Sequence, residues 1–133
     1  MISFTVSMPP TANNLFLNVR GRGRVKSPEY RAWIETNGWI VKVATQTGKI
    51  AGPYALVVQV GKPDNRRRDL DNLTKALNDL IVSTGAVRDD SDCQRIQIGW
   101  SEHHDDCFVQ VIETQPVPVR KKPSRQEISH AQA

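Results

Sequence analysis

The middle of the chain carries a strongly apolar segment followed by an amphipathic helical pattern. Residues 54–60 are rich in β-branched and apolar side chains, which predicts a central strand buried on both faces. After a polar, basic loop over residues 61–68, apolar residues recur from Leu70 at spacings of three and four, and the pattern stops at Gly85. A buried strand leading into such a helix restricts the chain to folds in which helices pack on a sheet.

The N-terminal half predicts two more strands and another helix. Apolar and polar residues alternate over residues 2–8, and residues 15–19 form a weaker strand. Ser27 and the proline after it are typical of a helix start, and this helix should run to about residue 48. Trp33 lies on the face of that helix that we expect to be buried, which favours a core role.

Two further strands are expected near the C-terminus. Residues 95–101 and 108–114 again alternate, and the short loop 102–106 between them favours a hairpin. Together the predicted elements give an α/β fold of the two-layer α+β kind, with helices packed on a mixed β-sheet.

The length of 133 residues fits one domain with a tail. Residues 1–115 hold all the predicted elements, whereas residues 116–133 are basic and apolar-poor, so this C-terminal tail is expected to be disordered. No run approaches the roughly 18 apolar residues of a membrane helix, and no secretory signal is visible, so we expect no membrane partner and a cytoplasmic location. There, Cys93 and Cys107 would be free thiols.

Positive charges are concentrated in two segments. Five cations lie in residues 20–31 against one acid and four in residues 62–68 against one acid, while residues 89–113 hold seven acids and one Arg. Basic clusters beside concentrated carboxylates indicate a polyanion bound near a cation site, although a solvated mixed surface would give similar counts. The candidate DNA-binding residues are cations of these two segments: Arg20, Arg22, Arg24, Lys26, Lys62, Arg66, Arg67 and Arg68.

Acidic residues stand where the central strand's exit loop meets the second helix. Asp69 and Asp71 would face the same side of an extended segment and could share a divalent cation, provided that Asp69 precedes the helix. Lys75 follows Asp71 by one helical turn and could reach a phosphate held there. Asp89 and Asp90 supply further carboxylates if the chain after the second helix folds back to this site.

An acid set with no obvious thiolate or imidazole favours a hard cation, Mg²⁺ first and Mn²⁺ second, and hence phosphate chemistry. Such a metal would polarise the scissile phosphate and lower the pKa of an attacking water, while Lys75 would offset charge in the transition state.

Other interpretations remain open for the same residues. Asp69 could cap the helix, Asp71 and Lys75 could be an ordinary surface ion pair, and residues 89–92 could be a solvated turn. Residues 103–106, with two histidines and two acids, could ligate a transition metal or form a polar loop. A nucleotide-sugar transferase is disfavoured because one small domain leaves little room for two substrates. The rival function is a non-catalytic DNA-binding or replication-accessory module.

The motif around the second helix resembles a known family. Its residues, in ungapped spacing after Pro63 and Asp64, are Arg68, Asp69, Leu70, Asp71, Asn72, Leu73, Lys75, Asp79, Gly85, Asp89 and Asp90. They resemble the signature of the RusA family of Holliday junction resolvases. The N-terminal half adds Pro9, Pro10, Thr11, Asn13, Asn14 and the helix start at residues 27–30, so the resemblance covers about residues 2–114.

The resemblance implies a RusA-like fold and a magnesium-dependent, homodimeric crossover junction endodeoxyribonuclease. It would bind four-way DNA junctions and nick two strands symmetrically, in DNA recombination and repair, or else act on other branched DNA. The family is common in prophages, which implies a bacterial or phage-encoded, nucleoid-associated protein. The family's metal-binding acids fall on Asp69, Asp71 and Asp90, and its essential lysine on Lys75.

Two segments depart from the family pattern. Asp92 adds an acid in the segment 91–94, where a small residue and then Gln would be expected directly after Asp90. The loop 102–106 is acidic where basic character would be expected.

Overall fold

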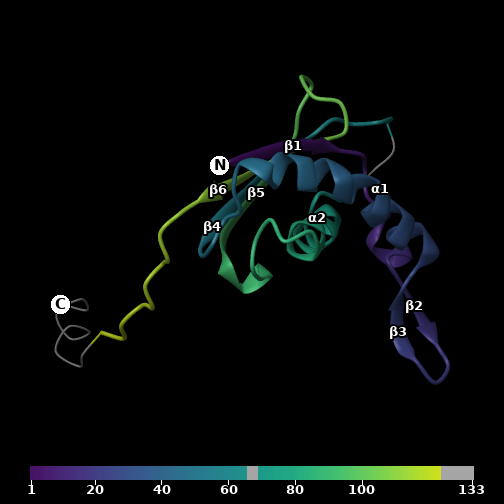
Figure 1. Cartoon of the computed structure of the whole chain (residues 1–133), viewed down its shortest axis with the longest axis horizontal. Helices are drawn as coiled ribbons and strands as arrows, with labels where there is room; N and C mark the ends of the chain where they lie inside the picture. Colours follow the sequence, from purple (N-terminus) through teal and green to yellow (C-terminus); the bar gives the residue numbers. More distant parts are fainter. Residues whose placement is uncertain (66–68, 124–133) are drawn as a thin grey trace, which may run out of the picture.

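The computed structural model describes residues 1–65 and 69–123, which form a four-stranded mixed sheet, two helices and a separate two-stranded ribbon (Figure 1). The sheet has the strand order β1–β6–β4–β5. Its strands are β1 (Ile2–Val6), β4 (Tyr54–Val60), β5 (Cys93–Trp100) and β6 (Cys107–Glu113). The remaining elements are the helices α1 (Pro28–Ala44) and α2 (Asp71–Ser83), the ribbon strands β2 (Phe16–Val19) and β3 (Gly23–Lys26), and the short 3-10 helices η1 (Ala12–Asn14), η2 (Thr45–Thr47) and η3 (Asp90–Asp92).

The predicted central strand is confirmed at both ends. β4 pairs in parallel with β5 and antiparallel with β6. Leu56, Val58 and Val60 are almost fully buried, whereas Val57 and Gln59 are only partly buried. The prediction of a strand covered on both faces is therefore wrong for its second half, because α1 and α2 pack side by side on one face only.

The first helix follows its predicted start. The hydroxyl oxygen of Ser27 accepts the backbone N–H of Tyr30 at 3.0 Å, and Pro28 opens the helix. α1 ends at Ala44, and η2 continues the chain to Thr47. Trp33 is 7% exposed and donates its indole N–H to the carbonyl oxygen of Ser7, which confirms its place in the core.

The predicted hairpin between the last two strands is wrong, because β4 lies between β5 and β6. The chain from β4 through α2 to β5 is a crossover between parallel strands, and the loop after β5 then crosses the end of β4. Two backbone hydrogen bonds fix this crossing, from Ser101 N–H to Val60 O (2.8 Å) and from Gly61 N–H to Asp106 O (2.9 Å). A Cβ atom at Gly61 would lie 2.0 Å from the carbonyl oxygen of His104, so the crossing requires glycine there.

One of the two strands in the ribbon of β2 and β3 matches a predicted strand. The weak strand over residues 15–19 is confirmed as β2. The strand β3 was not predicted, because the glycines in residues 20–24 are typical of a loop. Its register places Phe16 opposite Lys26 and Asn18 opposite Arg24. Figure 1 shows the ribbon projecting from the sheet and helices.

The chain after β6 leaves the sheet without forming a helix or strand as far as residue 123, and residues 116–123 are exposed. Val117 N–H donates to the side-chain oxygen of Gln94 at 2.9 Å. Disorder of the tail stays a prediction. In the described part of the chain, none of the helices is long and apolar enough to span a bilayer. Both cysteines are free thiols, as expected.

Candidate functional site

The acids that follow β4 stand at the start of α2. Asp71 is the first residue of the helix and Asp69 precedes it, as sharing a cation requires. The intervening Leu70 has helical dihedral angles (φ −64°, ψ −37°), and its carbonyl oxygen accepts the N–H of Leu73. Residues 69–71 are therefore not the extended segment on which Asp69 and Asp71 would face the same side, because the helical turn already begins at Leu70.

Asp69 does not cap α2, and Asp71 does not pair with Lys75. The N-cap residue is Leu70, whose side chain makes no capping hydrogen bond, so Asp69 is not the cap. Lys75 pairs with Asp79 at 3.8 Å, so Asp71 is not its ion-pair partner. Within residues 1–65 and 69–123, the exposed carboxylates of Asp69 and Asp71 form no ion pair and no side-chain hydrogen bond. A favourable interaction with the helix dipole is the structural benefit left to Asp71.

The third acid approaches the same helix from another segment. Gly85 adopts φ +80°, which ends the helix, and the chain returns so that η3 packs against α2. Asp90 opens η3 and is exposed. Nearby, Tyr54 donates its hydroxyl to the side-chain oxygen of Asn78 on α2 at 2.7 Å. Burial raises the pKa of Tyr54, and the charge of Asp90 contributes to this increase.

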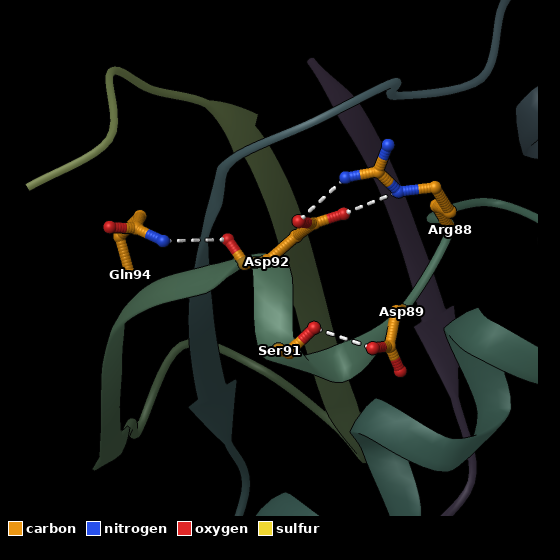
Figure 2. Close-up of polar contacts among 5 residues, drawn as sticks. All are labelled: Arg88, Asp89, Ser91, Asp92 and Gln94. Carbon is orange, nitrogen blue, oxygen red and sulfur yellow. Dashed lines mark hydrogen bonds and ion pairs between the residues drawn. The ribbon is translucent and has the colours of Figure 1, made fainter.

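The neighbours of Asp90 have structural partners (Figure 2). The Arg88 guanidinium donates to both carboxylate oxygens of Asp92, at 3.0 and 3.2 Å. The hydroxyl of Ser91 donates to Asp89 and is the main reason that the pKa of this carboxyl is lowered. The additional acid, Asp92, is thus paired with Arg88. Asp90 takes part in neither the Arg88–Asp92 pair nor the Ser91–Asp89 hydrogen bond.

The described residues do not assemble a complete metal cage. Among residues 1–65 and 69–123, no three side chains of His, Cys, Asp or Glu lie close enough together to hold a metal ion. Asp69, Asp71 and Asp90 are oxygen donors of the type that Mg²⁺ prefers, but they do not converge as a three-ligand group. The two histidines of the loop after β5 form no such group either: His104 stacks on Phe108 and contacts Ser101 Oγ through Nδ1, while His103 is exposed.

Three cations gather on a pair of aromatic rings where the ribbon meets the two helices. The guanidinium of Arg24 lies 4.2 Å from the centre of the Phe16 ring, and Lys75 Nζ lies 5.6 Å from the same centre. Lys26 Nζ lies 5.7 Å from the Tyr30 ring, which meets Phe16 edge to face at 5.8 Å. The structure therefore brings two predicted DNA-binding cations together with the predicted catalytic lysine.

The other candidate cations are more scattered. Arg20 and Arg22 are exposed at the turn of the ribbon. Lys62 Nζ lies 5.5 Å from the Trp100 ring, beside a cavity of about 680 Å³ between the loops after β4 and β5. Arg66, Arg67 and Arg68 lie outside the described residues.

The aromatic members of this cluster were missed by sequence reasoning. Phe16 lies in the segment 15–19, which predicts only a weak strand, and Tyr30 lies in the predicted helix start at residues 27–30. Their contacts join distant segments, so no local pattern indicates them. A signal did exist for Asp79, which follows Lys75 by four residues, the spacing of an ion pair on one helix face.

Comparison with known proteins gives consistent matches. A family model described as Endodeoxyribonuclease RusA matches residues 7–123. The chain is 37% identical over 89 residues to Crossover junction endodeoxyribonuclease RusA of Escherichia coli (strain K12), covering 67% of this chain and 73% of that protein. The enzyme of the same name from Shigella sonnei (strain Ss046) is 36% identical over 89 residues, with the same coverage. That of Enterobacteria phage 82 is 34% identical over 87 residues, covering 65% of this chain and 72% of the phage protein.

Proposed function

Because this chain belongs to the RusA family of endodeoxyribonucleases, we propose that it resolves four-way DNA junctions by paired, symmetric nicks. The relatives named above are crossover junction endodeoxyribonucleases from bacteria and a phage. The observation that carries the proposal is the pair of exposed carboxylates Asp69 and Asp71 at the start of α2, with Lys75 one turn further on; neither acid has an ion-pair partner among residues 1–65 and 69–123. The structure gives these acids little stabilising role in the described residues, whereas metal-assisted phosphodiester hydrolysis uses carboxylates to hold the ion.

Mg²⁺, with Mn²⁺ as the alternative, is the proposed cofactor. Mg²⁺ commonly takes one or two carboxylates and completes its coordination with water and substrate phosphate oxygens. Asp69 and Asp71 would therefore hold it in the DNA complex, with Asp90 as the third acid of the set. When bound, the metal would polarise the scissile phosphate and activate a water.

The chain's own cations have separate roles in this proposal. Lys75 donates to a non-bridging phosphate oxygen and offsets the charge that develops in the transition state. Arg24 and Lys26 contact the DNA backbone beside the scissile phosphate. The remaining candidate cations extend this contact along the DNA strand. The catalytic set is thus Asp69, Asp71, Asp90 and Lys75.

The proposed partners are branched DNA and a second copy of the chain. Two symmetric nicks require two sites related by a two-fold axis, which a homodimer supplies. The proposed location is the bacterial nucleoid, whether the protein is encoded by the bacterium or by a phage. Size-exclusion chromatography with light scattering tests the dimer, and a monomeric mass with and without junction DNA would contradict it.

The function is tested with a labelled four-way junction and a linear duplex of matching sequence, each incubated with Mg²⁺, Ca²⁺ or EDTA. Paired symmetric nicks in the junction alone, dependent on Mg²⁺, are the expected result. Tight junction binding without nicks in Mg²⁺ or Mn²⁺ would instead assign a non-catalytic DNA-binding module. Equal cleavage of flaps and forks would assign a nuclease for other branched DNA.

A further inference from the structure

A buried tyrosine donates a hydrogen bond to a carboxylate beside the proposed catalytic lysine. Tyr30 on α1 is fully buried, and its hydroxyl donates to Asp79 Oδ2 on α2 at 3.0 Å. Burial and the adjacent carboxylate both raise the pKa of Tyr30, so the hydroxyl keeps its proton and stays a donor. The core therefore fixes the orientation of this carboxylate.

The same carboxylate oxygen faces Lys75. Lys75 Nζ lies 3.8 Å from Asp79 Oδ2, and the side chain of Asp79 is 26% exposed against 56% for Lys75. The Phe16 ring lies 5.6 Å from Lys75 Nζ. The ammonium is thus bounded by a fixed acid on its own helix and by an aromatic ring of the ribbon.

We propose that Tyr30 and Asp79 are positioning residues that hold the Lys75 ammonium at the base of the ribbon, where the proposed reaction requires it. An exposed ion pair on a helix is usually weak because both side chains must be ordered to form it. Here the buried hydroxyl of Tyr30 has already ordered Asp79, so only the lysine remains to be restrained. The role in the reaction rests on the proposed junction cleavage, whereas the arrangement itself does not.

Tyr30 also connects the lysine to the ribbon. Its ring contacts Phe16 edge to face, and the ammonium of Lys26 lies over it. The cationic groups of Arg24 and Lys75 lie over the ring of Phe16. The described contacts of this cluster join three cations, Arg24, Lys26 and Lys75, to one acid, Asp79. The cluster therefore carries a net positive charge. A phosphate that enters it would meet Lys75 in one orientation.

The first test reads the arrangement without DNA. Full-length protein is treated briefly with an amine-acylating reagent, and the rate of Lys75 acylation is measured by mass spectrometry in wild type, Tyr30→Phe and Asp79→Asn. We expect acylation of Lys75 to be faster by about twofold or more in both variants, because the ammonium is released. Unchanged rates in both variants would overturn the proposal.

Two matched controls separate positioning from general loosening. Tyr54→Phe removes another buried hydroxyl that bonds to α2, through Asn78, and Glu35→Gln removes an exposed helix acid on α1. Both should leave Lys75 acylation unchanged. An equal increase in Tyr54→Phe would show that any loss of packing against α2 exposes the lysine, and would also overturn the proposal.

The second test is a double-mutant cycle on single-turnover junction cleavage. Asp79→Asn and Tyr30→Phe should each slow cleavage of bound junction by about tenfold, with the dissociation constant nearly unchanged. In a Lys75→Ala background neither should slow cleavage further. Equal losses in both backgrounds would mean that Asp79 does not act through Lys75. If wild type cuts no junction, the proposed function fails, and the acylation rates still decide the arrangement.

Discussion

Asp71 carries the sharpest prediction at the level of single side chains. It is exposed and without an ion-pair partner in the described segments, so Asp71→Asn should change the free energy of unfolding by less than about 1 kcal/mol. If the carboxylate binds the metal, junction cleavage should fall by about 100-fold or more while junction binding persists. Gel-based cleavage and binding assays measure the two effects.

Glu29 offers a matched control for that variant. It is an acid in the first turn of α1, as Asp71 is in α2, so Glu29→Gln tests the loss of a helix-dipole interaction alone. Cleavage by Glu29→Gln should match wild type. Cleavage by Asp71→Asn at the wild-type rate, with unchanged metal dependence, would remove Asp71 from the site.

Cys107 predicts a decline in stability at alkaline pH. Burial, with a smaller effect of Asp106, raises the pKa of this thiol from 9.0 to about 12. The unfolded chain therefore releases the thiol proton above pH 9 while the folded protein retains it, so the free energy of unfolding falls as pH rises from 9 to 12. The buried hydroxyls of Tyr30 and Tyr54 act in the same direction at higher pH.

Denaturant unfolding at several pH values between 8 and 10.5 measures this decline. One group contributes at most about 1.4 kcal/mol per pH unit. Cys107→Ala should lower stability at pH 8, where the thiol is protonated in both states, and should flatten the slope above pH 9. An identical slope in wild type and variant would show that the thiol has no part in it.

The sequence indicates which side chains lie near one another when they are close in the chain, but it does not predict contacts between side chains that only the fold brings together. Asp69, Asp71 and Lys75 lie within seven residues, so their spacing alone places them at one helix start. Tyr30 and Asp79 are 49 residues apart, and their hydrogen bond exists only because α1 and α2 pack together. No helical or strand periodicity reports such a contact.

The loop that joins β5 to β6 crosses the end of β4 closely at Gly61. A methyl group at Gly61 would overlap the backbone of the loop that joins β5 to β6, so Gly61→Ala should lower the free energy of unfolding by about 2 kcal/mol or more. Gly99 on β5 has no atom within 4 Å of the equivalent position, and Gly99→Ala should change stability by less than about 1 kcal/mol. Urea unfolding compares them, and equal stabilities would contradict the crossing.

The elements themselves were predictable where the periodicity was strong. β4 and α2 match their predicted extents within about two residues because burial imposes a clear pattern on each. The pairing of β5 and β6 was misjudged because alternation identifies a strand but not its neighbour. The crossover through α2 had already placed β5 parallel to β4, which left the far side of β4 for β6.

At the scale of the whole molecule, we expect the basic tail to contribute to DNA affinity and not to stability. Removing residues 116–133 should leave the melting temperature within about 2 °C of wild type, because residues 116–123 are exposed. Junction affinity at low salt should fall, and the slope of log affinity against log salt should decrease by about 2 to 3. A large drop in melting temperature would show that the tail is docked.

A tail of full length with altered charge separates length from electrostatics. Replacing Arg120, Lys121 and Lys122 with Gln should reproduce most of the loss of affinity. Affinity and salt slope equal to wild type in this variant would assign any effect of the deletion to the length of the tail.

The pairing of β1 with β6 also bears on synthesis of the protein. In the described part of the chain, β1 has β6 as its strand partner, and Ile2 pairs with Val111. The sheet therefore closes only after residue 111 has left the ribosome. Until then the alternating apolar residues of β1 and one edge of β4 stay open to other nascent chains. A message truncated before β6 would therefore yield an aggregating product rather than a smaller enzyme.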